Sequence, residues 1–422
     1  MDSRHEKLRE RWVQFLYISI LFSPVLPAAV LLLMGIISPY LLKGKWKPFG
    51  WPERIFLAFV VLSTVSWVFN PYLLFDWLPV AVVPILSFGL YVILSVWMKR
   101  GLDWTWVRYQ KLYTMFWIAG LYPAIVTILQ RVDWMPIGRS AFFYFLGFYP
   151  MQAEGVRSIG PALNSNLAAA LLICLALLSI YATSLARNRW EKAGAFFIFF
   201  VHCGAIWCTG SRGAWVGLVL GLLVQVWMTG KRKRAVAFFL GLVAAAMVIA
   251  TNKTLIPRED TLLATYHVRK FVWQNSFEIF RENWLIGVLP LHFSSLFEVK
   301  TGKLLFHAHN VFLGIASEYG IFGLFLFLTL IVVTTARARR WRKTANDRKE
   351  KRLAGVLISI IFALLGHGMY DYPIIAPQLG LIFMSSVMVI NAQFERRCLR
   401  PPWCKNGKEN GVEQSKERGP HF

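Results

Sequence analysis

Residues 12–42 read WVQFLYISILFSPVLPAAVLLLMGIISPYLL, a run of about thirty mostly apolar residues with Pro24 and Pro27 near its middle. Arginines precede this run, and Lys43 and Lys45 follow it. A single span would put the two basic clusters on opposite sides of a membrane. A turn at the prolines puts both on the cytoplasmic side, where basic residues accumulate. We therefore expect two short spans joined as a hairpin.

Apolar runs of similar length continue through the chain. Its 422 residues are 56% hydrophobic and 16% charged, and each run approaches the ~20 residues that cross a hydrocarbon core. Further spans are expected near residues 55–69, 78–98, 112–129, 166–185, 193–209, 213–229, 235–251, 309–335, 353–370 and 377–393. Because strand-length alternation is absent, the sequence predicts an all-α integral membrane protein with about twelve transmembrane helices.

The formal net charge of +24 would suggest nucleic acid in a soluble protein. Here the basic residues gather in short links between spans, at 99–100, 187–192, 231–234 and 337–352. The positive-inside rule explains them more simply, so we expect cytoplasmic links, cytoplasmic termini and no nucleic-acid partner. The five cysteines, Cys174, Cys203, Cys208, Cys398 and Cys404, have no metal-binding spacing and indicate no disulfide framework.

Two large segments are predicted on the external side, residues 130–165 and residues 252–308. The second is a large extracytoplasmic (periplasmic) loop between the ninth and tenth spans. It contains an amphipathic stretch that we expect to lie on the membrane surface. Its apolar face comprises Val268, Phe271, Val272, Ile279, Phe280 and Trp284. We expect one membrane domain over residues 1–395 and a polar cytoplasmic tail over residues 396–422.

His309 stands at the predicted start of the tenth span, directly before Asn310 and two residues after His307. A helix N-terminus disfavours an imidazolium, so His309 should be neutral and able to accept a proton. The alternative is an interfacial histidine that merely wets a helix end. Asn310 could cap or orient the helix, and His307 could assist. Glu318 lies inside the span, where an acid needs a partner or a polar cavity.

Several arginines are also placed where a ligand could reach them. Arg212 lies in the tight turn 209–215, TGSRGAW, where a guanidinium offers a planar fork for phosphate oxygens. The alternative is a snorkelling arginine that anchors the helix end. Arg269 lies on the amphipathic stretch with Trp273 one turn later, or is simply a solvated or headgroup-contacting arginine.

Four further residues stand at predicted external span ends. Arg157 precedes Asn164 and Asn166, whose amides could bind sugar hydroxyls or simply cap the helix. Asp371 follows another span and could orient a histidine or serve as a turn residue. Gly320 and Gly323 are spaced to permit close helix packing.

Three motifs that would indicate other kinds of enzyme are absent from the sequence. The sequence has no Asp-x-Asp metal motif, no Walker A loop and no Gly-x-Ser-x-Gly elbow. An external site would also lack access to cytoplasmic nucleotide sugars and ATP, so its donor must already be activated. A diphosphate-linked lipid meets this need, and arginines could stabilise the departing diphosphate without a metal.

Together these residues resemble the O-antigen ligase and polymerase superfamily, from about Arg157 to Pro373, in addition to the twelve-span layout. The superfamily's patterns match His309-Asn310 with Gly320 and Gly323, Ser211-Arg212-Gly213, and Arg269 with Trp273. Its Asn-Pro-Asn span start is Asn164-Ser165-Asn166 here, and its acid-aromatic-Pro resembles Asp371-Tyr372-Pro373.

The resemblance implies a metal-independent, inverting glycosyltransferase in the cytoplasmic (inner) membrane of a bacterium, with its site on the extracytoplasmic face. The donor would be an undecaprenyl-diphosphate-linked glycan. His309 would be the catalytic base, and Arg212 and Arg269 would hold the donor. Supporting candidates are Arg157, Asn166, His307, Asn310 and Asp371. The resemblance implies no metal and no cofactor.

The acceptor remains open among members of this superfamily. A ligase acting on a lipid A-core glycolipid is the leading interpretation, while a repeat-unit polymerase or a protein O-oligosaccharyl ligase would use the same site chemistry. From another class, a multi-pass transporter would show many spans too. It would place charges at mid-membrane and could show inverted repeats, whereas the charges here cluster at one face.

Overall fold

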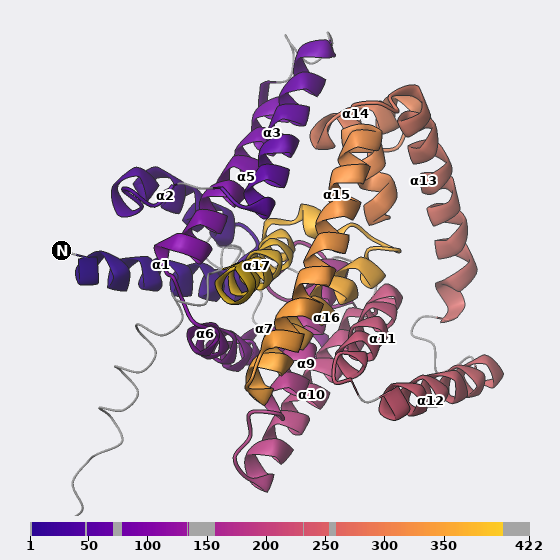
Figure 1. The fold of residues 1–422 in the computed structure, drawn as a ribbon. Helices are drawn as coiled ribbons and strands as arrows, with labels where there is room; N and C mark the ends of the chain where they lie inside the picture. Colours follow the sequence, from indigo (N-terminus) through magenta and orange to yellow (C-terminus); the bar gives the residue numbers. More distant parts are fainter. Residues whose placement is uncertain are drawn as a thin grey trace, which may run out of the picture.

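The computed structural model describes residues 2–46, 49–70, 78–132, 134, 157–230, 232–252 and 259–399. Across these ranges the regular structure is helical and contains no strand (Figure 1), which confirms the all-α prediction. Most of the predicted external segment 130–165 and most of the predicted tail, including Cys404, lie outside the described residues.

The predicted N-terminal hairpin contains two helices, α1 (Asp2–Phe22) and α2 (Leu26–Leu41), while their role as membrane spans stays a prediction. The chain turns at residues 23–25, where the Ser23 hydroxyl accepts hydrogen bonds from the backbone N–H groups of Val25 and Leu26, each at 3.3 Å. Pro27 stands in the first turn of α2, where a proline costs no helical hydrogen bond.

A helix occurs at every other predicted span as well. The elements up to residue 251 are α3 (Trp51–Phe69), α5 (Leu78–Val96), η1 (Trp97–Gly101), α6 (Trp106–Ala119), α7 (Leu121–Arg131), α9 (Ser165–Ala182), α10 (Arg189–Thr209), α11 (Arg212–Trp227) and α12 (Arg232–Thr251). The remaining elements are η3 (Glu259–Thr261), α13 (Leu262–Glu282), α14 (Pro290–Thr301), α15 (Val311–Thr344), α16 (Arg348–His367), η4 (Pro373–Ile375), α17 (Pro377–Phe394) and η5 (Glu395–Leu399).

Seven candidate spans among the described residues are long and apolar enough to cross a membrane. The count of about twelve spans and the sidedness of the loops therefore stay predictions. The helices α9, α16 and α17 lie in the middle of the bundle in Figure 1 and are buried along almost their whole length. By contrast, large apolar side chains such as Phe197, Phe200 and Val332 are more than half exposed. An apolar outer surface suits a protein whose solvent is lipid.

The predicted amphipathic stretch forms α13, which runs beside α15 at the right of Figure 1. Val272 and Ile279 are buried and pack with residues of α14. Val268 and Phe271, from the same predicted face, are 60% and 39% exposed. The helix is therefore partly built into the bundle, and only the rest of its apolar face is left to contact other surroundings.

The tenth predicted span is not one continuous helix. Within α15, Gly320 has φ 65° and ψ −167°, which breaks the helical path. Segment 284–289 fills the break, since Ile321 donates its N–H to the Trp284 carbonyl at 2.7 Å and Leu289 donates to the Glu318 carbonyl at 2.8 Å. A Cβ on Gly320 would overlap the Leu285 carbonyl. Gly320 thus permits a chain break and a close backbone approach, rather than the helix packing expected from its spacing.

We expect Gly320→Ala to destabilise the folded protein by at least about 1–3 kcal/mol, because the left-handed φ and the overlap are both unfavourable for a side chain. Thermal unfolding of the purified protein in detergent measures this loss. Gly204→Ala is the matched control, because an added Cβ there meets nothing within 4 Å in α10. Equal melting temperatures for the two variants would contradict the role given to Gly320.

Candidate active site

Asn310 ties the start of α15 to the end of α16. Its Oδ1 accepts hydrogen bonds from the N–H groups of Phe312 and Leu313 at 3.0 and 3.1 Å, so Asn310 is the N-cap of α15. Its Nδ2 donates to the Met369 carbonyl at 3.2 Å. Asn310 therefore caps α15 and also contacts the segment after α16. This junction brings the residues before α15 to those after α16.

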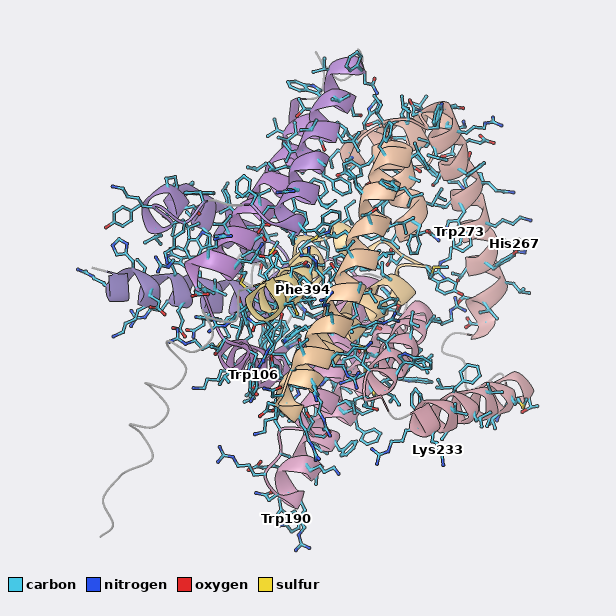
Figure 2. All side chains as sticks on the ribbon, viewed as in Figure 1. Trp106, Trp190, Lys233, His267, Trp273 and Phe394 are labelled. Carbon is cyan, nitrogen blue, oxygen red and sulfur yellow. The ribbon has the colours of Figure 1, made fainter. Side chains whose placement is uncertain are left out.

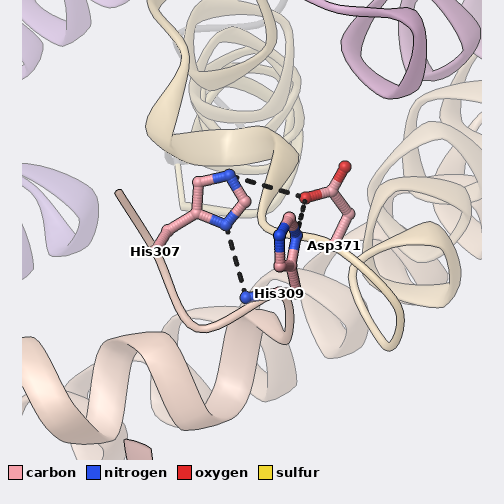
Figure 3. Close-up of side chains that lie close together, drawn as sticks. All are labelled: His307, His309 and Asp371. Carbon is pink, nitrogen blue, oxygen red and sulfur yellow. Dashed lines mark hydrogen bonds and ion pairs between the residues drawn. The ribbon is translucent and has the colours of Figure 1, made fainter. Parts of the chain in front are cut away.

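His307, His309 and Asp371 meet at that junction (Figure 3). The His309 Nδ1 lies 3.1 Å from the Asp371 Oδ1, and the His307 Nε2 lies 3.7 Å from the same oxygen. The backbone N–H of His309 donates to the His307 Nδ1 at 3.3 Å. The carboxylate of Asp371 is buried, whereas the side chain of His309 is 29% exposed. The buried carboxylate of Asp371 therefore lies against the ring of a partly exposed histidine.

These contacts fix which imidazole nitrogen carries the proton in each neutral ring. A carboxylate only accepts hydrogen bonds, so the His309 Nδ1 must be the protonated nitrogen. The His309 Nε2 then keeps its lone pair and can accept a proton. In His307 the Nδ1 accepts from the backbone, so the proton sits on Nε2 and faces Asp371.

Burial and neighbouring charges set the ionisation of the pair that supports His309. Burial lowers the pKa of His307 to about 4, an effect that the Asp371 carboxylate opposes. Burial would raise the pKa of Asp371, but the hydrogen bond from His309 and the nearby histidines outweigh it and hold that pKa well below its usual value. At neutral pH Asp371 is therefore ionised and His307 is uncharged.

The backbone of His309 is itself constrained. Its φ of 49° lies in the left-handed region, which is uncommon for a residue with a side chain. The indole of Trp273 on α13 donates to the His309 carbonyl at 3.3 Å and helps hold this conformation (Figure 2). Left-handed backbone of this kind persists where the surroundings fix it, often at functional sites.

The two predicted donor-binding arginines lie at the same end of the bundle. The Arg269 guanidinium lies 5.5 Å from the ring centroid of Tyr370, the neighbour of Asp371. The Arg212 Nη2 donates to the Thr265 hydroxyl at 2.8 Å, one turn before Arg269 on α13. A Cβ on Gly213 would lie 3.2 Å from the Tyr370 Cβ, which shows how closely this turn approaches the site.

The turn that holds Arg212 forms because α10 ends in a left-handed glycine, Gly210, with φ 62°. Arg157 braces this turn by donating its Nε to the Thr209 carbonyl at 2.9 Å. Its Nη2 donates to the Asn166 Oδ1, also at 2.9 Å. The amide oxygen of Asn166 thus serves a protein contact, and Asn164 caps α9 through Leu167.

Three further residues, His367, Tyr372 and Glu318, lie close to Asp371, to Gly213 or to each other. His367 is buried at the end of α16, and its Nδ1 would lie 3.4 Å from a Cβ on Gly213. The Tyr372 hydroxyl donates to the Glu318 Oε2 at 3.0 Å, which supplies the partner that a buried acid requires. His367, Tyr370 and Tyr372 lie close to Asp371 in the sequence, and this closeness was the signal that could have placed them near the site.

The same three side chains could also hold a metal ion. One ligand atom from each of His307, His309 and Asp371 lies within 4.8 Å of the others, and two imidazoles with a carboxylate suit zinc or iron. In the present geometry the Asp371 Oδ1 already accepts hydrogen bonds from His309 and from the Tyr372 N–H at 2.8 Å. The sequence did not suggest this set, because Asp371 is 62 residues from His309.

The lowered pKa of His307 predicts a loss of stability in acid. The unfolded chain binds a proton at His307 between pH values of about 6.5 and 4 where the folded chain does not, so folding weakens as pH falls through that window. The loss is at most about 3 kcal/mol. The stability that comes from the lowered pKa of Asp371 is lost only at lower pH. Thermal unfolding at pH 7.5 and 4.5 should show a smaller drop for His307→Gln than for wild type.

The exposed His267 on α13 provides the matched control (Figure 2). His267→Gln should keep the wild-type dependence on pH. A His307→Gln variant that loses as much stability as wild type between these pH values would show that the acid sensitivity arises elsewhere.

Comparison with known proteins matches part of the chain to one family. Residues 195–328 match the family model described as O-antigen ligase, a range that contains Arg212, Arg269, His307 and His309 but not Asp371. No curated protein matches the chain. The apolar helices and the family match together indicate a multi-pass bacterial membrane protein of the glycosyltransferase type. The match over residues 195–328 supports membership of the O-antigen ligase superfamily.

Proposed function

We propose that this protein transfers a glycan from undecaprenyl diphosphate to an acceptor hydroxyl at the outer face of the bacterial cytoplasmic membrane. The observation that carries the proposal is the hydrogen bond between the His309 Nδ1 and the buried Asp371, which leaves the His309 Nε2 open as a base. Arg269 and Arg212 approach the same junction from α13 and α11. Paired His and Asp residues also carry protons in transporters, so the O-antigen ligase match over residues 195–328 is what favours a glycosyltransferase.

In the proposed reaction the acceptor hydroxyl gives its proton to the His309 Nε2 as its oxygen attacks the anomeric carbon. The bond between that carbon and the diphosphate oxygen breaks, and its electron pair leaves with the diphosphate. Attack from the face opposite the leaving group inverts the configuration at the anomeric carbon. The Asp371 carboxylate then stabilises the imidazolium that forms, as the buried carboxylate of a catalytic triad does.

The leaving diphosphate gains negative charge in the transition state, and preorganised cations stabilise such charge most effectively. Arg212 stands at the first residue of α11, so the N-terminal end of the helix dipole adds to its positive charge. Arg269 is fixed against the Tyr370 ring. A guanidinium can bind two phosphate oxygens at once, which an ammonium cannot match. We propose that these two arginines replace a metal ion in this role.

The acceptor follows from the resemblance rather than from the geometry. A lipid A-core glycolipid is the leading candidate, and the same base would serve a growing polymer or a protein hydroxyl. A base that acts on one hydroxyl does not distinguish these acceptors, so the repeat-unit polymerase and the protein-directed ligase share this mechanism.

We expect His309→Ala to lower the rate of transfer by ~10²–10⁴, the usual cost of losing a general base. Asp371→Asn should lower it too, because an amide that donates to the His309 Nδ1 favours the wrong tautomer. An in vitro assay with purified lipid-linked donor and acceptor measures both. His267→Ala, on the exposed face of α13, should keep wild-type activity. Wild-type transfer by His309→Ala would rule out the proposed base.

We expect Arg212→Lys and Arg269→Lys each to lower transfer by ~10-fold or more, because the planar fork is lost although the charge is kept. Arg281→Lys is the control, since Arg281 is exposed near the far end of the same helix α13. The same assay with EDTA should leave wild-type activity unchanged.

Two results would revise this mechanism. Abolition by EDTA with recovery on adding a divalent ion would make His307, His309 and Asp371 metal ligands instead of a proton network. Full activity in both lysine variants would make Arg212 and Arg269 membrane anchors.

A further inference from the structure

A cavity lies at the opposite end of the bundle from His309. It has a volume of about 690 Å³ and lies among the start of α3, the end of α5 with η1, and the far ends of α15 and α17. Along α17, Pro377 begins the helix near the candidate active site, whereas Gln393 lines this cavity. Sixteen helical residues span about 24 Å at ~1.5 Å per residue. The cavity is therefore separate from the site described above.

The lining of this cavity is strongly basic. Two acidic residues, Asp103 and Glu395, line it together with six basic ones. The basic residues are Lys45, Arg54, Lys99, Arg100, Arg337 and Arg396.

Some of these cations are neutralised by acids of the bundle. Lys99 lies 3.1 Å from a carboxylate oxygen of Glu53 and 2.8 Å from one of Glu395, and it is almost fully buried. Arg337 shares Glu395 at 3.6 Å and packs on Phe394 at the end of α17 (Figure 2). A Cβ on Gly50 would meet the Lys99 ammonium, so a side chain at this position would shift the end of Lys99. Arg396 pairs in turn with Asp103 at 3.6 Å.

The other three cations of the lining are Lys45, Arg54 and Arg100. Within the part of the chain that the structure describes, no acidic side chain lies within ion-pair distance of Lys45, Arg54 or Arg100. The Lys45 ammonium donates a hydrogen bond to the Arg100 carbonyl at 3.4 Å. Three like charges in one cavity repel each other, and an anion bound among them would remove that repulsion.

The cavity also has the mixed character of a lipid headgroup region. Phe49, Trp51, Met98 and Trp104 line it beside the cations. It opens at the ends of apolar helices, where the hydrocarbon of a membrane gives way to headgroups. Basic pockets between membrane helices are known to bind anionic headgroups on the side where basic residues gather.

We propose that this cavity binds the phosphate of an anionic phospholipid headgroup. Arg54 and Arg100 offer planar forks to the phosphate oxygens, and Lys45 adds a point charge. The aromatic and methionine side chains of the lining contact the glycerol and the first carbons of the acyl chains. The bound lipid contacts both the start of α3 and the end of α5 with η1, which line the cavity together. This site is independent of the glycosyl-transfer chemistry proposed above.

The test uses the full-length protein purified in detergent and titrated with phosphatidylglycerol, phosphatidylcholine or inorganic phosphate, with thermal unfolding as the readout. Phosphatidylglycerol should raise the melting temperature of the wild type more than phosphatidylcholine does. Arg54→Gln with Arg100→Gln should weaken the phosphatidylglycerol response by at least about tenfold in concentration, because two charge-assisted interactions are lost. Arg54→Lys with Arg100→Lys keeps both charges and should weaken the phosphatidylglycerol response less. This comparison separates the loss of charge from misfolding.

The control is Arg187→Gln with Lys192→Gln, which removes two exposed cations outside the cavity. This variant should respond like wild type. Equal responses to the two lipids in wild type, or equal losses in the cavity and control variants, would overturn the site. Saturation by inorganic phosphate at millimolar concentration, abolishing the phosphatidylglycerol response, would overturn the lipid and identify a soluble phosphate compound as the ligand.

Discussion

A buried carboxylate needs hydrogen-bond donors, because an unpaired charge in a low-dielectric interior is costly. Asp371 finds them in the ring of His309 at 3.1 Å and in the N–H of Tyr372 at 2.8 Å. One oxygen atom therefore sets the orientation and the tautomer of His309, and it draws His307 to within 3.7 Å. The geometry of the proposed base depends on this single buried charge.

Keeping His309 beside Asp371 constrains the helices around it. The start of α15 must meet the end of α16, and the Val311 N–H does so by donating to the Gly368 carbonyl at 2.7 Å. His309 then adopts a left-handed backbone, which Trp273 supports from α13. Because the same helix carries Arg269 one turn earlier, the contact that holds the base also positions the proposed donor-binding arginine. The break at Gly320 lets segment 284–289, which follows α13, dock against α15.

Local patterns made the helical class, the hairpin at Pro24 and the cap at Asn310 predictable, because each depends on neighbouring residues. The contact between His309 and Asp371 joins residues 62 positions apart, so the sequence suggested only that Asp371 could orient a histidine and not which one. Helix α15 continues beyond residue 335, the predicted end of the tenth span, to Thr344, because a helix can extend past the apolar run that marks a span. The break at Gly320 was also hidden, because it depends on segment 284–289 supplying backbone partners.

The central claim is that Asp371 holds His309 as a base while Arg212 and Arg269 hold the donor's diphosphate. An experimental structure of the protein with an undecaprenyl-diphosphate-linked glycan bound tests it most directly. We expect the diphosphate within hydrogen-bond distance of both guanidinium groups, the anomeric carbon open to a hydroxyl on the His309 Nε2, and the His309 Nδ1 still bonded to Asp371. A diphosphate bound away from these arginines, or a metal ion bridging His307, His309 and Asp371, would contradict the claim.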